Sequence, residues 1–449
     1  MSTEDHIKEL EETIIRLITE RDNAIERAQQ LEKENEAIKK RLLFYENPHT
    51  PPSVKNLKKE SAQKNKISRK KQGAPKGHRG ATRKRLEPTE LVRVTAKCCP
   101  KCRHPVGEPT RTETKVIEEL VKPPEIKVIQ FDIDIYECEK CRFVFTAKHE
   151  DCPQKGNFGV FLLLYITMLK FYLRGVIRKI QEFLLVGNSF EISVKGIHDI
   201  LLRVGKSCEK GYDKIKKRIR NSRWVHIDET GMKVDGNNWW LWIFRSSEGE
   251  ILVVIRKSRG KKVVHEILGK DYDRPIIVDG WNAYKGFKIT QRCWVHLLRE
   301  VDEFNKIHFG KMLSEIIHGK FKELKEFLAR NPNMNERKNQ KEIWDREMEE
   351  LVDQFIGCKK LKGPVGYIKN GLGNWYTCLL YPGMDPTNNL AEQAIREHVI
   401  VRKIIGSFHS EKGSENYQYI ASLLATWRLQ GKNGFKEMEQ VLRKELCLS

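Results

Sequence analysis

The stretch Arg223-Trp-Val-His-Ile-Asp-Glu-Thr230 contains the first of several short apolar segments that decide the fold of this chain. Four more such segments follow it, and a helical pattern over Lys261 to Leu268 precedes the fourth. The five expected strands are Trp224 to Ile227, Trp239 to Phe244, Ile251 to Ile255, Pro275 to Val278 and Arg292 to Val295. Three strands, a helix and another strand, with helices after them, predict a mixed α/β sheet. Residues 223–449 are therefore expected to form one domain with C-terminal helices.

Length, charge and hydropathy narrow the class of protein. The 449 residues include 83 Lys and Arg against 61 Asp and Glu, for a net charge of +22. The length suggests about three domains of roughly 150 residues each. The longest apolar run, Val160 to Leu169, is shorter than the ~20 residues that a membrane span needs, and the acidic N-terminus has no signal-peptide pattern. We expect no membrane association, a cytoplasmic location and a polyanionic partner, most often nucleic acid.

Residues 1–46 carry a heptad pattern. Positions from Ile7 to Leu42 at steps of three and four are mostly apolar, and Glu, Lys and Arg fill the others. This spacing predicts a leucine-zipper-like coiled coil, and Asn35 at an a position favours two strands. We therefore expect a homo-oligomer, at least a dimer. The alternative is one amphipathic helix packed on its own protein.

Residues 47–94 are expected to form a basic, flexible DNA-binding arm. Residues 55–85 hold thirteen Lys or Arg and one acidic residue, Glu60, and almost no apolar residues. Such a segment cannot bury a core, and we expect it to contact phosphates; a solvated linker is the alternative. The arm residues singled out are Lys70, Lys71, Lys76, Arg79, Arg83, Lys84 and Arg85.

Residues 95–152 contain two CxxC pairs around a β-rich stretch, Lys127 to Glu137. Two such turns bring four thiolates together, which suits structural Zn²⁺ in a zinc ribbon and leaves no open position for catalysis. The predicted ligands are Cys99, Cys102, Cys138 and Cys141, since Cys99 rather than Cys98 gives the two-residue spacing. Four unliganded cysteines are the alternative. The helical residues 153–222 then predict either a helix-turn-helix or a helical spacer.

Acidic residues at the ends of expected strands are the first candidates for chemistry. Asp228 follows the first strand and Asp279 the fourth, while Glu392 lies in an expected helix with a polar N-terminus. Together they would form an oxygen-rich pocket of the kind that Mg²⁺ and Mn²⁺ prefer, able to activate a water or a 3′-OH for phosphoryl transfer. Composition and spacing alone do not select this trio. The competing acids, which we interpret as turn or cap residues, are Glu229, Asp235, Asp273 and Asp302.

Four motifs in a fixed order resemble those of the IS66-family DDE transposases. They are His226-Ile-Asp-Glu-Thr230, Val278-Asp-Gly-Trp-Asn-Ala-Tyr284, Cys293-Trp-Val-His-Leu-Leu-Arg299 and Asn388-Asn-Leu-Ala-Glu-Gln-Ala-Ile-Arg396. The order of zipper, basic segment, cysteine ribbon and catalytic domain is also similar, so the resemblance covers nearly the whole chain. The helices before Asp228 match the family pattern poorly.

The resemblance implies an RNase H-like catalytic core in a multidomain α/β protein, with a helical insertion near 302–372. It implies that Asp228, Asp279 and Glu392 are catalytic and hold two Mg²⁺ or Mn²⁺ ions. It further implies double-stranded DNA as partner and substrate, cleavage at element ends, and attack of the freed 3′-OH on target DNA. Accessory transposition proteins and a prokaryotic nucleoid-associated location belong to the same expectation. The implied supporting or phosphate-binding residues are His296, Arg299, Asn388 and Arg396; for His296 a structural role is equally open.

Two other functions compete with a transposase. One is a DNA-binding regulator with an inert catalytic fold, and the other is an RNase H-like nuclease without strand transfer. The presence of all three acids favours activity, and the coiled coil with the ribbon favours the binding of paired DNA ends.

Overall fold

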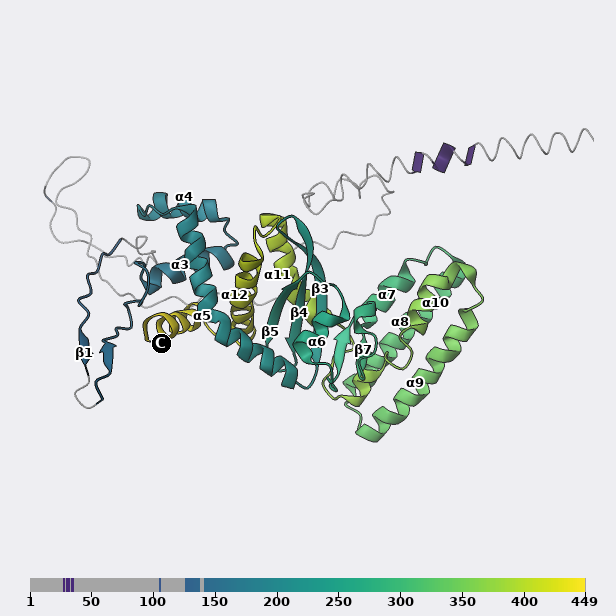
Figure 1. The fold of residues 1–449 in the computed structure, drawn as a ribbon. Coiled ribbons are helices and arrows are strands. Elements are labelled where there is room, and N and C mark those ends of the chain that lie inside the picture. Colours follow the sequence, from purple (N-terminus) through teal and green to yellow (C-terminus); the bar gives the residue numbers. More distant parts are fainter. Residues whose placement is uncertain are drawn as a thin grey trace, which may run out of the picture. The chain divides into compact units, whose positions relative to one another are not determined.

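The computed structural model describes residues 27–28, 30–32, 34–35, 105, 126–137 and 141–448. The chain divides into two compact units, residues 1–125 and 126–449, and the second contains nearly all of the described residues (Figure 1). In the first unit, the seven described residues between 27 and 35 are helical and exposed. The expected coiled coil otherwise lies outside the described residues, as do the whole basic arm and the cysteines at 99, 102 and 138.

A five-stranded mixed sheet forms the centre of the second unit. Strands β3, β4 and β5 pair antiparallel, whereas β6 and β7 continue the sheet parallel to β3, in the order β5-β4-β3-β6-β7. The strands are β3 Val225–Val234, β4 Asn237–Ser246, β5 Ile251–Arg256, β6 Ile276–Val278 and β7 Thr290–Arg292. The prediction of a mixed α/β sheet is therefore confirmed, with the helix α6 (Lys261–Leu268) before β6 as expected.

Two expected strand boundaries are wrong. β3 continues through Asp228 to Val234, because Asp228, Glu229 and Thr230 pair with residues of β4 despite their polarity. β7 ends at Arg292, and the next residues enter helix α7 (Trp294–Asp302). The hairpin between β3 and β4 turns at Asp235 and Gly236, whose φ angles of 49° and 71° suit a two-residue turn. Asp235 is therefore a turn residue, as expected.

Helices cover both faces of this sheet because its strands alternate between two apolar faces. On one face, Ile227, Trp242 and Val254 share a core with α5, α6 and the first helices of the unit. On the other face, Leu241, Val253 and Ile395 share a core with α11 and α12. The flanking helices are α3 Val160–Phe171, α4 Ile177–Asn188, α5 Val194–Asn221, α11 Asn389–Ile405, α12 Glu411–Leu429 and α13 Gly434–Leu442, followed by a π-helical turn, η4, at Arg443–Leu448.

The outer edge of the sheet is covered by α12. The side chains of Gln418, Ser422 and Thr426 accept hydrogen bonds from the backbone N–H groups of β5, with donor–acceptor distances of 2.9–3.0 Å. These N–H groups belong to Ile255, Val253 and Ile251, in that order. A helical step of four residues and a strand step of two residues both advance about 6–6.7 Å, so one row of side chains can follow one strand edge.

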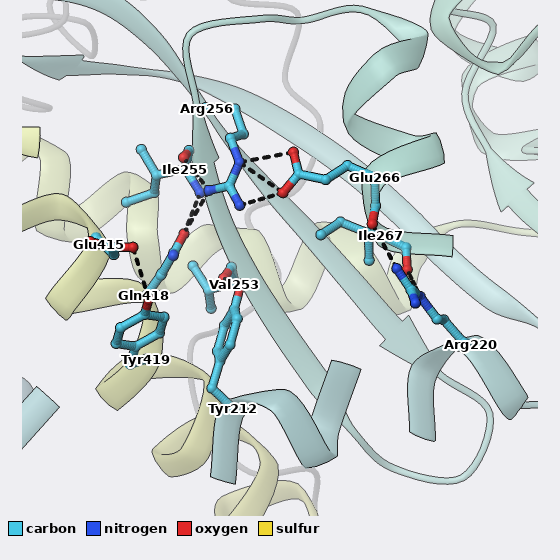
Figure 2. A network of polar contacts seen from close by, with 10 residues as sticks. All are labelled: Tyr212, Arg220, Val253, Ile255, Arg256, Glu266, Ile267, Glu415, Gln418 and Tyr419. Atoms are coloured by element: carbon cyan, nitrogen blue, oxygen red, sulfur yellow. Dashed lines mark hydrogen bonds and ion pairs between the residues drawn. The ribbon is translucent and has the colours of Figure 1, made fainter. Parts of the chain in front are cut away.

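Ion pairs and hydrogen bonds tie α5, α6 and α12 to the same strand (Figure 2). The Arg256 guanidinium pairs with both Glu266 carboxylate oxygens and donates to Gln418 Oε1 at 3.2 Å. From α5, Tyr212 donates its hydroxyl to the carbonyl of Val253 at 3.2 Å. The polar groups at this edge are therefore satisfied by three different helices.

A separate helical segment lies between β7 and α11 in the sequence and has its own core. It comprises α7, α8 His308–Ala329, α9 Met334–Phe355, η2 Lys359–Leu361, α10 Lys362–Lys369 and η3 Thr377–Leu380. Its core includes the fully buried rings of Trp294, Trp375 and Tyr376. Chain following α10 also covers β7: Asn374 O accepts from Arg292 N at 2.9 Å, and Thr377 Oγ1 donates to Thr290 O at 2.7 Å.

The helical region expected before β3 consists of three helices, α3 to α5, with Ser193 capping α5 by accepting from Gly196 N. Before them, β1 (Ile135–Glu137) and β2 (Val144–Thr146) make a two-stranded antiparallel hairpin. The β-rich stretch expected from Lys127 is thus a strand only from Ile135. Among the described residues, no helix combines the length and the apolar character needed to span a membrane.

Candidate active site

Asp228 lies inside β3 on the face that meets α11. Alternation along β3 puts His226 and Asp228 on this face and Glu229 on the opposite one. At the start of α11, Asn388 donates through Nδ2 to Ile227 O at 2.7 Å and accepts at Oδ1 from His226 Nδ1 at 3.2 Å. Near the end of α11, Arg402 donates to Thr230 Oγ1 at 3.0 Å. Helix α11 is therefore held along β3 on both sides of Asp228.

Asp279 and Glu392 are both close enough to Asp228 for their charges to affect its ionisation. Burial raises the pKa of Asp228 to about 7, and the charges of Glu229, Asp279 and Glu392 contribute to this rise. Asp228 Oδ1 accepts one hydrogen bond, from Glu229 N at 3.0 Å. Negative charges therefore surround the Asp228 carboxyl group, and a divalent cation bound there would neutralise them.

Asp279 directly follows β6, as expected. Its Oδ1 accepts from the backbone N–H of Trp281 at 2.8 Å, which fixes the carboxylate at the strand end. At the next residue, Gly280, a Cβ atom would lie 2.4 Å from Arg292 Nη2 and 2.6 Å from a ring carbon of Tyr367. Glycine at this position allows β7 and α10 to pack against the turn that carries Asp279.

Glu392 lies in the first turn of α11, where the positive end of the helix dipole favours a carboxylate. Its Oε2 is 3.3 Å from Arg299 Nη2, and its Oε1 is 3.6 Å from His296 Nδ1. Both partners come from α7. The structure therefore brings together Glu392 from one motif and His296 and Arg299 from another, and their supporting roles stay predictions.

The other two expected supporting residues differ in position. Asn388 is fully buried, so its side chain supports the contact between α11 and β3 and exposes no surface to a phosphate. Arg396 is exposed one turn after Glu392. Only Arg396 of these two is accessible to a polyanion.

Glu229 is not the turn or cap residue that the sequence suggested. Its side chain is 1% exposed, and it accepts from Arg259 Nε at 2.9 Å and from the hydroxyl of Tyr284. Burial is the largest influence on Glu229 and raises the pKa of its carboxyl group, while these two hydrogen bonds oppose the shift. Glu229 is therefore a buried structural carboxylate on the face of β3 opposite to that of Asp228.

An arginine and two tryptophans link Glu229 to the loop after Asp279. The Arg259 guanidinium lies 4.6 Å from the ring centroid of Trp240 and 3.8 Å from that of Trp281. Trp281 also donates its indole N–H to Arg259 O at 3.3 Å. Sequence reasoning assigned no role to Arg259, Trp281 or Tyr284, although the last two lie within the motif that starts at Val278.

One further group of metal-ligand side chains meets at this site. Cys293, His296 and Glu392 offer donor atoms within 4.8 Å of one another, and within the described part of the chain no other three His, Cys, Asp or Glu residues do so. Asp228, Asp279 and Glu392 are thus close enough to influence one another electrostatically but more widely spaced than this group. Sequence reasoning missed Cys293 as a donor, although it opens the motif that contains His296.

Of the four predicted zinc ligands, the structure describes only Cys141. Cys141 is exposed and makes no disulfide with a described residue, while its three expected co-ligands lie outside the described residues. The seven arm residues between Lys70 and Arg85 also lie outside them. Zinc binding by the ribbon and phosphate binding by the arm remain predictions.

Comparison with known proteins gives one family. A family model described as Transposase IS66 family matches residues 155–416, which is more than half of the chain. The matched region starts before α3 and ends in α12, so it includes Asp228, Asp279, Glu392 and the residues around them. The search of curated proteins found no significant match.

Proposed function

Since this chain belongs to the IS66 family of transposases, we propose that it is the transposase of an insertion sequence, which binds the element ends and catalyses metal-dependent cleavage and transfer of DNA strands. The observation that carries this proposal is the electrostatic coupling of Asp228 to Asp279 and Glu392, three carboxylates from a central strand, a neighbouring strand end and a helix. Family membership confirms the resemblance seen in the sequence.

We also propose that the sheet and its helices are an RNase H-like core. Three antiparallel strands followed by parallel β6 and β7, with a helix before β6, support this assignment. In such a core the first carboxylate belongs on the central strand, the second at the end of its parallel neighbour, and the third on a later helix. Asp228, Asp279 and Glu392 occupy these three kinds of position.

The residues at the site suit hard divalent cations. Carboxylate oxygens are the ligands that Mg²⁺ and Mn²⁺ prefer, and burial together with the charges of nearby carboxylates raises the pKa of Asp228. We propose that Asp228, Asp279 and Glu392 hold the ions. When bound, the ions would polarise the scissile phosphate and stabilise both the attacking and the leaving oxygen.

The surrounding residues hold these carboxylates in place. The N–H of Trp281 fixes the Asp279 side chain, and Arg299 contacts one oxygen of Glu392. Asn388 and His226 keep the start of α11 against β3, so that Glu392 stays opposite Asp228. Arg299 and Arg396 are the basic groups we propose for contact with DNA phosphates near the site.

In this proposal, the parts of the chain outside the catalytic core bind DNA and mediate the association of protein copies. We assign phosphate contact to the basic arm, end recognition to the zinc ribbon, and dimerisation to the N-terminal heptads. The excess of Lys and Arg over the whole chain supports a DNA partner. Activity is proposed to take place on the chromosome in the cytoplasm of a prokaryote, with accessory transposition proteins as further partners.

The proposal is tested with purified protein, Mg²⁺ and the DNA that flanks its own gene, by mapping nicks and joined products. Asp228→Asn, Asp279→Asn and Glu392→Gln should each reduce cleavage to background while end binding stays near that of the unaltered protein, because these substitutions remove a metal ligand and keep side-chain size. Asp235→Asn, at an exposed turn in the same domain, is the matched control.

The products separate the competing functions. Cleavage by one of the three variants at the unaltered rate would remove that residue from the site. Nicks without joined products would identify a nuclease, and end binding without nicks would identify a non-enzymatic regulator.

A further inference from the structure

Cys293, His296 and Glu392 meet where two helices begin. Cys293 is the residue immediately before α7, His296 lies in the first turn of α7, and Glu392 lies in the first turn of α11. Their donor atoms lie within 4.8 Å of one another. Two of these donors, a thiol and an imidazole, are not ligands that Mg²⁺ prefers, so the group is chemically distinct from the three carboxylates.

Two atoms of this group lack a hydrogen-bond partner among the described residues. His296 Nδ1 and Glu392 Oε1 are both inaccessible to solvent and are left unpaired by the described part of the chain. They face each other at 3.6 Å, which is too long for a hydrogen bond. Buried polar atoms are rarely unpaired in folded proteins, and an ion bound between two such atoms can satisfy them. A cation at this point would serve both the imidazole and the carboxylate.

A backbone N–H group at the start of α11 fixes the position of the Cys293 sulfur. Its Sγ, fully buried, accepts the backbone N–H of Asn388 at 3.1 Å. The sulfur is therefore held at the start of α7, within reach of an ion that His296 and Glu392 also bind.

We propose that Cys293, His296 and Glu392 form a second cation site, selective for a divalent ion that accepts sulfur and nitrogen ligands, such as Zn²⁺. Zinc bonds of about 2.0–2.3 Å place tetrahedral ligands about 3.5 Å apart, so a small inward movement of the three side chains closes the site. Three protein ligands leave a fourth position open. Binding releases the Cys293 proton to solvent and changes no oxidation state.

Glu392 is the residue that the two sites share. An ion held with His296 and Cys293 takes one oxygen of Glu392, while Arg299 contacts the other. The Glu392 oxygen that binds this ion is then unavailable for an ion held with Asp228 and Asp279. Zinc at the second site therefore inhibits Mg²⁺-dependent cleavage, a consequence that rests on the proposed function, whereas the binding of zinc does not.

Cobalt spectroscopy tests the site without relying on activity. The full chain is first given one equivalent of Zn²⁺ to fill the proposed ribbon, and Co²⁺ is then added. The near-ultraviolet charge-transfer band of a cobalt–thiolate bond should appear in the unaltered protein and in Cys358→Ser, which removes a half-buried cysteine just after α9. It should be absent in Cys293→Ser, because the serine hydroxyl keeps the hydrogen bond to Asn388 N and gives no such band.

His296→Gln is the second variant, on a side chain that is partly exposed. It should keep the sulfur ligand and weaken cobalt binding by about 10-fold or more, since even partners of metal ligands contribute about 10- to 100-fold to affinity. An equal cobalt band in Cys293→Ser and the unaltered protein would overturn the proposal, as would unchanged cobalt affinity in His296→Gln.

A zinc titration of Mg²⁺-dependent cleavage tests the consequence. The Zn²⁺ concentration that halves the activity should rise by about 10-fold or more in Cys293→Ser, each protein being compared with its own rate without zinc, and should not change in Cys358→Ser. Equal inhibition of all three proteins would refute competition for Glu392. If the unaltered protein cleaves no DNA, the proposed function fails while the cobalt band still decides whether the cation site exists.

Discussion

Asp228, which we propose as a metal ligand, lies where ionisation of its carboxyl group is unfavourable. Its carboxyl group is partly buried, beside Glu229 and near Asp279. Burial and these neighbouring charges make ionisation of the group less favourable than in water and raise its pKa to about 7. The ordinary pKa of this group is 3.8. The folded protein therefore holds a proton on Asp228 over a pH range in which the unfolded chain has released it.

This difference gives a pH-dependent stability of definite sign. Between pH 4 and 7 the folded state binds more protons than the unfolded state, so the free energy of unfolding falls as the pH rises and is constant above about pH 7. Without added divalent ions, Asp228→Asn should be more stable than the unaltered protein at pH 8, by a few kcal/mol at most at about 1.4 kcal/mol per pKa unit. Urea unfolding at pH 4.5, 6 and 8 measures the difference.

Asp235→Asn removes a carboxylate from an exposed hairpin turn and serves as the control. It should follow the unaltered protein at all three pH values. A stability difference for Asp228→Asn that does not change with pH would show that Asp228 ionises normally in the folded protein.

At the scale of elements, α12 and β5 are matched by their repeats. Side chains four residues apart on the helix accept hydrogen bonds from N–H groups two residues apart on the strand. Thr426 both accepts and donates a hydrogen bond. Its hydroxyl accepts from Ile251 N at 3.0 Å and donates to Ile251 O at 3.1 Å. Both hydrogen-bonding groups of one strand residue are thus satisfied by one helix side chain.

Replacing Thr426 by Val should therefore destabilise the protein by about 1–3 kcal/mol, because it keeps the shape and leaves a buried N–H and C=O unpaired. Thr426→Ser keeps the hydroxyl, loses one methyl group and should cost about 0.8 kcal/mol. Thermal or urea unfolding of both variants measures the difference. A larger loss for Thr426→Ser than for Thr426→Val would show that the methyl group, and not the hydroxyl, matters here.

The same elements show what could be predicted from the sequence. Short apolar segments located the five strands approximately, because the strands are buried on both faces, and α6 has the expected bounds. The run Asp228-Glu-Thr-Gly231 was taken for the end of a strand because it is polar, whereas pairing with β4 and contacts from Arg259 and Tyr284 carry β3 through it. Arg259 and Tyr284 are distant in sequence, so no local pattern predicts their contacts, whereas the Asp235-Gly236 turn between β3 and β4 is a local hairpin signal that could have extended the predicted strand.

Some residues of the candidate site could be predicted from the sequence, and others follow only from tertiary packing. Asp279 could be located from a strand end, and family motifs pointed to Glu392, His296 and Arg299. The thiol of Cys293 joins them only because α7 and α11 begin side by side, which is a tertiary relation. The buried position of Asn388 follows from the same packing.

On the scale of the whole molecule, charge is distributed unevenly. Of the net +22, residues 55–85 contribute +12, with thirteen basic residues and one acidic residue. The site itself gathers carboxylates, which repel phosphate unless cations neutralise them. Holding DNA and cutting it are therefore assigned to different parts of the chain.

Removing charge from the arm should change the salt dependence of DNA binding. Replacing Lys70, Lys71, Arg83 and Arg85 together by Ala should reduce the slope of log affinity against log salt by about 0.9 for each phosphate that the arm no longer neutralises. Fluorescence anisotropy at several salt concentrations measures this slope. The matched control is Ala at four exposed lysines of α8 and α9, Lys311, Lys322, Lys325 and Lys338. Equal reductions in the two variants would contradict the assignment of binding to the arm.

The covering of both sheet edges has a consequence for how copies of this protein meet. Side chains of α12 occupy the N–H groups of β5, and the chain after α10 occupies groups of β7. A strand from another molecule would have to displace these partners before it could extend the sheet, which protects the protein from edge-to-edge aggregation. Any self-association of the protein is thereby directed to surfaces other than the edges of this sheet.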